Sequence, residues 1–464
     1  MKKVFFAKTI LFFLTTTLLC YAQTDSALLS QEAYLAQVLA QHPVAKQANL
    51  QQDFASATML DAKGKFDPKL SASWKDKFLS DKHYYRHFST KLLIPTQYGL
   101  QVSANYENNS GYYLNPENKT DKYGLWAVGI EANILQGFFI DERRAAIQQA
   151  RIYEKITKNE RQMMLNNLAL MASLAYIEWQ KNYYTQQILA EAMQIAQNYR
   201  QATTQSFLGG EKTAIDTLEA FLMVQDRMLM MQENEMLLEN TKQQLENYLW
   251  QNNQPIALNN TTIPEIIETE NLLSSATLEV REVVNTHPQI LEKNYKRAYY
   301  EVELRAKKDK LKPKLKLKYV PLLKTAENSI APNYALANYK WGFEFAMPLL
   351  FRSERASVQK SQLKIKNVDW SVADKRNELQ NKIEASLQQQ QFLQQQIALQ
   401  QQNLEGYKKL LDAENTKFEY GESSVFLVNK RQEKYIDAKI KLISWKIKYK
   451  KEYSKYLYFT NDIL

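Results

Sequence analysis

The sequence predicts an α+β protein in which very long helices alternate with short amphipathic strands, and in which this layout occurs twice. Glycine and proline number only 11 each in 464 residues, so few residues interrupt regular structure. Residues 117–254 and 349–464 contain no proline and are rich in Gln, Lys, Glu, Leu and Ala, which favour helices. Near the prolines, short runs alternate apolar and polar side chains, which is the pattern of a strand with one apolar face.

The N-terminus has the pattern of a secretory signal. Three lysines precede an apolar run over residues 10–19, and Ala22 follows at a suitable cleavage position. We therefore expect residues 1–22 to be removed, although Cys20 leaves a lipoprotein signal with an acylated Cys20 as an alternative. No later stretch has the 18 consecutive apolar residues of a membrane-spanning helix. The exported chain is thus expected in the periplasm, outside the cell, or in an outer membrane as β-strands.

Long helices are expected within residues 141–250 and 352–460. A helix over residues 141–208 alone would be about 100 Å long at 1.5 Å per residue. Apolar residues in the second region recur every seven positions, as in a coiled coil: Ile397, Leu404, Leu411 and Phe418.

Landmarks of the first half recur in the second half in the same order. The matching pairs are residues 42–43 with 287–288, 65–70 with 310–315, 139–143 with 351–355, and 207–211 with 418–422. The sequence therefore predicts an internal duplication, with a first repeat over residues 23–254 and a second over 255–464. The offset falls from 245 to 212 between the second and third pairs, so the first repeat carries an insertion of 33 residues there.

Strands are expected within residues 68–135 and 313–348. Trp126, Val128 and Ile130, for example, alternate with small or polar residues. Such strands fit either a soluble sandwich or a barrel wall that is apolar toward lipid and polar toward a lumen. Six runs alternate in all, because residues 87–94 and 98–106 of the insertion do so as well. Several aromatic residues suit the girdles of a barrel: Trp74, Trp126, Trp341, Tyr84, Tyr85, Tyr112 and Tyr113.

The order of these elements resembles the TolC family of outer-membrane efflux proteins over essentially the whole chain after the signal. The matching pieces are the two His-Pro pairs, the strand exits at residues 134–138 and 347–351, the Glu-Arg pairs at 142–143 and 354–355, and the glycines that break each long helix. The resemblance implies a homotrimeric α+β membrane protein. Its shared β-barrel would stand in outer-membrane lipid, with a long α-helical coiled-coil tunnel extending into the periplasm. Twelve strands, four per chain, are expected, and more are possible with the insertion.

The same resemblance implies a passive exit duct of a tripartite efflux or type I secretion system. Its partners would be a periplasmic adaptor and an inner-membrane pump of the RND or ABC type, and no cofactor would be needed. Drugs, metal ions and proteins all remain possible cargo. A non-transport coiled-coil scaffold of the cell envelope is the alternative, although a scaffold needs no amphipathic strands.

The glycine breaks have a structural and a functional interpretation. Glycine commonly ends a helix in the left-handed conformation, which explains these positions without any function. The family resemblance adds that the turns form periplasmic tips that contact the adaptor. The residues concerned are Phe207, Leu208, Gly209, Gly210, Tyr420, Gly421 and Glu422.

A tunnel entrance is expected just beyond these tips. Relatives carry an acidic pair six and nine positions after the second glycine, where this chain has Leu427 and Lys430. Asp216 and Glu219 occupy the corresponding places of the first repeat. A charged gate formed by these residues and an ordinary solvated helix surface both remain open.

No motif indicates catalysis. The chain lacks the nucleophile, phosphate-binding and zinc-protease patterns, so we expect a protein that is not an enzyme. A single cysteine and four histidines offer little for a metal site; His83 and His87 lie four residues apart without a third ligand nearby. Nucleic-acid binding is not expected for an exported chain.

Overall fold

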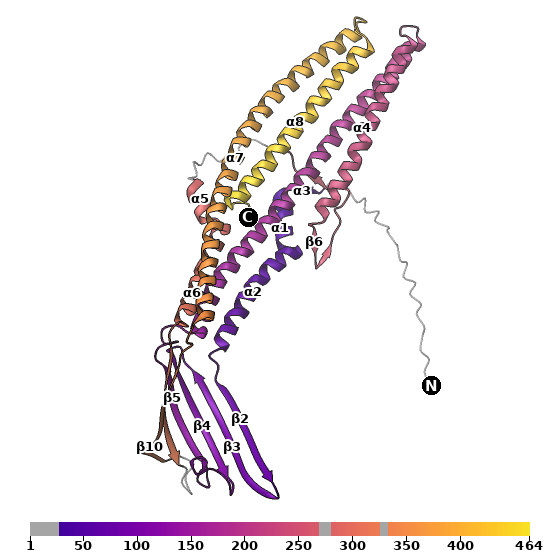
Figure 1. The fold of residues 1–464 in the computed structure, drawn as a ribbon. Helices are drawn as coiled ribbons and strands as arrows, with labels where there is room; N and C mark the ends of the chain where they lie inside the picture. Colours follow the sequence, from indigo (N-terminus) through magenta and orange to yellow (C-terminus); the bar gives the residue numbers. More distant parts are fainter. Residues whose placement is uncertain (1–26, 269–279, 325–332) are drawn as a thin grey trace, which may run out of the picture.

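The computed structural model describes residues 27–268, 280–324 and 333–464, and the expected signal peptide with Cys20 lies outside these ranges. The molecule is elongated. A sheet forms one end, and two long helical hairpins run from it to the other end (Figure 1).

The sheet has six strands, each antiparallel to its neighbours. They form where the six alternating runs of the sequence predict them. Their order across the sheet is β10-β9-β5-β4-β3-β2. The bounds are β2 Lys69–Leu79, β3 Lys82–Pro95, β4 Leu100–Ser110, β5 Leu125–Asn133, β9 Lys314–Lys324 and β10 Asn333–Ala346.

The segment expected from the sequence to be an insertion supplies two strands of this sheet. Strand β3 pairs with β4 from Arg86 opposite Ser110 to Pro95 opposite Gln101. The β3–β4 hairpin lies between β2 and β5, so it is part of the sheet and not an appendage beside it. The sequence left four or six strands per chain open, and among the described residues this sheet has six.

Each long helical region consists of two helices that form an antiparallel hairpin. Helix α3 (Glu142–Leu208) has 67 residues and packs along α4 (Ala214–Glu246). Helix α7 (Arg352–Glu419) has 68 residues and packs along α8 (Val425–Thr460). These lengths far exceed the roughly 11–12 residues of an average helix. They follow from the scarcity of glycine and proline.

Shorter helices pack along the two hairpins. Their bounds are α1 Gln31–Gln41, α2 Pro43–Gly64, α5 Val280–Thr286 and α6 Pro288–Asp309, and a 3₁₀ turn, η1, spans Pro116–Asn118. Helices α2 and α6 each have 22 residues, run down to the sheet (Figure 1) and begin in the same way. In each, the Nδ1 atom of the preceding histidine accepts a hydrogen bond, from Val44 N in α2 and from Gln289 N in α6, both at 3.2 Å. Proline then occupies the first position, where no N–H is needed.

Two small strand pairs complete the fold beside the hairpins. Strand β1 (Leu28–Leu29) pairs in parallel with β8 (Ile263–Pro264). Strand β6 (Trp250–Gln251) forms a short hairpin with β7 (Gln254–Pro255).

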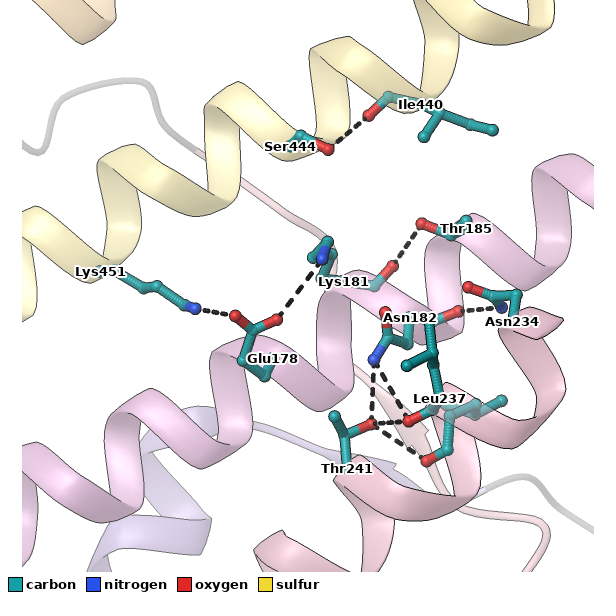
Figure 2. Close-up of polar contacts among 11 residues, drawn as sticks. Glu178, Lys181, Asn182, Thr185, Asn234, Leu237, Thr241, Ile440, Ser444 and Lys451 are labelled. Atoms are coloured by element: carbon teal, nitrogen blue, oxygen red, sulfur yellow. Dashed lines mark hydrogen bonds and ion pairs between the residues drawn. The ribbon is translucent and has the colours of Figure 1, made fainter.

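Helix α3 is the central element of the helical part. It contacts α2, α4, α6 and α8, and the largest buried cluster gathers around Tyr34, Tyr176 and Trp179. Polar contacts also join α3 to its neighbouring helices (Figure 2). Asn234 of α4 donates to the carbonyl of Asn182 at 3.0 Å, and the Asn182 side chain donates to Thr241 Oγ1 at 3.2 Å.

A second set of polar contacts joins α8 to α3. Lys451 of α8 bonds Glu178 of α3, and Lys439 bonds Glu191 of α3 at 2.7 Å (Figure 2 shows the first). The two hairpins of one chain are thus fastened to each other by ion pairs as well as by apolar packing. Among the described residues, no helix has an apolar stretch sufficient to cross a membrane.

Candidate channel wall and helical tips

The sheet sorts its side chains into two chemically different faces. Because alternate residues of a strand point to opposite faces, the pairing register assigns each residue to one side. We call the first side the apolar sheet face. Its members are Leu70, Trp74, Phe88, Leu92, Val102, Ala104, Trp126, Val128, Ile130, Leu315, Leu317, Tyr319, Tyr339, Trp341, Phe343 and Phe345.

Exposure along β5 is the reverse of that on a strand of a water-soluble protein. On β5 the side chains of Trp126 and Ile130 are 40% and 52% exposed, whereas the residues that follow them, Ala127 and Glu131, are 8% and 4% exposed. Trp341 and Phe343 on β10 are both more than half exposed. Large contiguous apolar surfaces of this kind are rare on soluble monomers and mark contact with lipid or another protein.

The opposite side, the polar sheet face, is organised around one buried carboxylate. Glu131 of β5 receives Lys316 at 2.5 Å and Lys318 at 3.3 Å from β9, and Lys91 from β3 at 3.9 Å. Nearby, Ser103 Oγ and Asn105 Oδ1 are buried without a hydrogen-bond partner in the structure. Ionised and polar groups therefore gather on this side of the sheet.

Aromatic rings form a row across the apolar sheet face. Trp74 lies 5.8 Å from Phe88, which lies 6.2 Å from Tyr106, which lies 5.0 Å from Trp126. Interfacial aromatic residues are a feature of membrane barrels. Trp74, Trp126 and Trp341 occupy the apolar face as the sequence predicts.

The predicted tyrosines are distributed differently. Tyr84 packs against Tyr113, and Tyr112 against Tyr113, at the far end of the sheet. Tyr85 is in register with Lys77 and therefore lies on the polar face. It does not belong to an apolar girdle, because a register position on a strand, and not residue type, decides which face a side chain joins.

The two helical tips have the same backbone geometry. After α3, the N–H of Gly210 donates to Phe207 O at 3.0 Å, and that of Glu211 to Ser206 O at 2.9 Å. After α7, Gly421 donates to Phe418 O at 3.0 Å and Glu422 to Lys417 O at 2.9 Å. Both are Schellman motifs with a left-handed glycine at φ +77°. Gly209, by contrast, has φ −77° and needs no glycine.

The tips expose apolar side chains. Leu208 and Tyr420 are 73% and 79% exposed, and Phe207 is 41% exposed. Sequence reasoning missed Ile215, Leu218 and Phe426, which are also exposed just beyond the turns. The sequence signal for these residues was a large apolar side chain in the first turns of a helix. A coiled-coil interpretation assigns such residues to the buried contact between helices, so it does not predict their exposure.

The predicted entrance residues make local contacts in this chain. Asp216 forms a capping box with Thr213 at the start of α4, and its hydrogen bonds from Thr213 lower the pKa of its carboxyl. In the described part of the chain, Lys430 pairs at 3.1 Å with Glu433 of its own helix and not with Asp216 or Glu219. Leu427 is 42% exposed.

One contact bridges the two hairpins close to their tips. The ring of Tyr199 on α3 lies 5.2 Å from that of Phe418 on α7, and the Lys212 ammonium lies 4.5 Å from the centre of the same Phe418 ring. Burial raises the pKa of the Tyr199 phenol, and the nearby charges of Asp216 and Glu219 add to this effect.

Within the described ranges, no three His, Cys, Asp or Glu side chains gather as metal ligands. His83 instead bonds Asp76 at 2.6 Å.

Comparison with known proteins gives matches in structure only. No protein-family model and no curated protein matches the sequence. Solved structures match over 93% of the chain. CusC aligns over 91% of its own chain with TM-score 0.66 and 15% identity. The CmeC outer membrane channel of Campylobacter jejuni aligns over 85% with TM-score 0.66 and 12% identity.

VceC, an outer membrane protein of Vibrio cholerae, aligns over 96% of its chain with TM-score 0.66 and 12% identity. The chain has the fold of the TolC-type outer-membrane channels. The resemblance drawn from the sequence is thereby confirmed at the level of the fold. Because the alignments cover most of each matched structure, the similarity of fold includes both the sheet and the helical hairpins.

Proposed function

We propose that the protein is an outer-membrane channel, the passive exit duct of an export system with a periplasmic adaptor and an inner-membrane pump. The observation that carries the proposal is the sheet with an exposed apolar face opposite a charged face that is organised around buried Glu131. A wall between lipid and water needs this distribution, whereas a coiled-coil scaffold of the envelope does not. The fold shared with outer-membrane channels supports the same conclusion.

The sheet of one chain has two edges, at β2 and β10. Unpaired backbone groups at an edge cost several kcal/mol each in hydrocarbon, so a sheet in lipid must close. Six antiparallel strands are an even number, so β2 of one copy meets β10 of the next with opposite direction. We infer a homotrimer whose three six-stranded sheets close one barrel of eighteen strands. This barrel would have more strands, and so a larger diameter, than the twelve-stranded barrel that the family resemblance implies.

The helical hairpins would then continue the barrel as a periplasmic tunnel. Three copies bring together six tips, each with exposed apolar side chains and a rigid glycine turn. These tips are the proposed contact with the adaptor, and Asp216, Glu219, Leu427 and Lys430 lie beside them at the proposed entrance. Energy for transport would come from the pump, because the described residues offer no catalytic cluster.

The test is the location and assembly of the full-length protein expressed with its own leader. We expect it to fractionate with outer membranes and to run as a trimer by native mass spectrometry in mild detergent. Recovery as a soluble monomer after osmotic shock would overturn the proposal. A membrane-bound dimer would retain the location and reject the eighteen-stranded barrel.

A further inference from the structure

Charged residues are distributed very unevenly between the two sides of the sheet. On the apolar face, within the continuous register, the only charged residues are Asp76 and Arg86, which pair at 3.6 Å. The polar face carries nine lysines and three glutamates. They are Lys69, Lys75, Lys77, Lys91, Lys314, Lys316, Lys318, Lys324 and Lys340, with Glu107, Glu131 and Glu344.

Local ion pairs leave a positive excess on this face. Nine lysines minus three glutamates give +6 per chain, and Asp121 in the loop before β5 neutralises one more through Lys324 at 3.6 Å. The excess is then +5. In the described structure, five exposed lysines of this face have no carboxylate within 4 Å. Lys77 lies over the ring of Tyr84 at 4.9 Å, and the other four, Lys69, Lys75, Lys314 and Lys340, are the ones we call the free lysines.

These four lysines stand at two levels along the strands. Lys69 and Lys314 are the first residues of β2 and β9, beside the helical part of the molecule. Lys75 and Lys340 lie further along, opposite His87 and Val320. Repetition around a closed wall would turn each level into a ring of ammonium groups.

We propose that the polar sheet face forms an anion-attracting lumen, so that the outer-membrane segment favours negatively charged small solutes. This rests on the proposed channel function. Charges of one sign lining a passage with low-dielectric walls focus their field and raise the local concentration of counter-ions. Three chains would bring an excess of fifteen positive charges, three times five, to one lumen.

Ionic strength gives the inference a signature of its own. The Debye length is about 10 Å at 0.1 M salt and about 3 Å at 1 M. Anion preference that comes from wall charges must therefore be strong in dilute salt and weaken as salt increases. Anion preference caused by size exclusion or by a single bound ion would not weaken with salt in this way.

The experiment is reversal-potential measurement on the purified full-length protein in planar bilayers under a KCl gradient. We expect a chloride-to-potassium permeability ratio above about 3 near 0.1 M salt that falls toward 1 near 1 M. Replacing the four free lysines, Lys69→Gln, Lys75→Gln, Lys314→Gln and Lys340→Gln together, reduces the excess from +5 to +1 per chain and should abolish most of the preference. Glu131 and its three lysines stay intact, so the buried ion cluster is preserved.

The matched control replaces the same four lysines by arginine, which keeps the charge and should keep the preference. Native mass spectrometry shows whether both variants assemble as the parent does. Cation preference in the parent, or equal selectivity in the Gln and Arg variants, would overturn the anion-attracting lumen and leave the channel standing. Absence of any conductance in the assembled parent would contradict the channel itself, and the lumen with it.

Discussion

At the residue scale, neighbouring glycines at the first tip have different roles. Gly210 has φ +77°, a conformation that disfavours any residue with a Cβ, while Gly209 has ordinary helical angles. A Cβ at Gly210 or Gly421 would meet no atom within 4 Å. The requirement for glycine at these two positions is therefore conformational and owes nothing to crowding.

Gly210→Val should destabilise the tip turn by about 1–2 kcal/mol, because the left-handed conformation is strained for an L-residue. Hydrogen exchange of the amides at 209–213 should accelerate by about tenfold, and export should fall if the tip binds the adaptor. Gly209→Val is the matched control. Equal exchange rates in the two variants would show that the turn does not depend on the left-handed glycine.

At the element scale, the His-Pro pairs begin α2 and α6 and also make the start of α6 sensitive to acid. His287 is 4% exposed, and burial lowers the pKa of its ring to about 4. Its Nδ1 accepts the N–H of Gln289, a bond that requires this nitrogen to be unprotonated. The folded state thus holds a neutral histidine, whereas the unfolded chain takes up a proton near pH 6.5.

Because the folded pKa lies below the unfolded one, the contribution of His287 to stability is complete above pH 6.5 and is lost as the pH falls toward 4. Between pH 7.5 and 5 this amounts to about 2 kcal/mol. His287→Asn keeps a capping oxygen that does not titrate, so urea unfolding should show a smaller loss of stability over this range. His87→Asn on the sheet caps no helix and serves as the control; a parallel pH dependence in the parent and His287→Asn would contradict the assignment.

The sheet is the second case at the element scale. Alternation predicted all six strands, but it left open whether the β3–β4 hairpin joins the same sheet as the others. Strand pairing decided this point, because β3 forms backbone hydrogen bonds with both β2 and β4 along most of its length. A hairpin with one apolar face and hydrogen-bonding partners on both sides leaves fewer backbone groups exposed inside the sheet than beside it.

At the scale of the whole molecule, closure of the proposed barrel depends on the two outer strands. The described residues contain no cysteine, so paired cysteines placed on β2 and β10 report contacts between copies in a Cys20→Ser background. Cysteines at Ser73 and along residues 339–345 should form disulfide-linked oligomers on oxidation, because paired edge strands bring Cα atoms within the required 4.4–6.8 Å. Cysteine at Ser89 of β3, an inner strand, should not cross-link to the same positions. Cross-linking from Ser89 but not from Ser73 would exclude closure through the edges.

Much of the architecture is determined by the sequence itself, because it depends on local rules. The scarcity of glycine and proline determines long helices, a positive-φ glycine determines each tip, and period-two alternation determines the strands and the two faces of the sheet. Only the tertiary structure decided which segments lie beside one another: six strands in one sheet, three lysines converging on buried Glu131, and Tyr85 on the polar face. These features depend on register and on contacts between residues distant in the chain, and a one-residue change of register would reassign every side chain without altering the alternation.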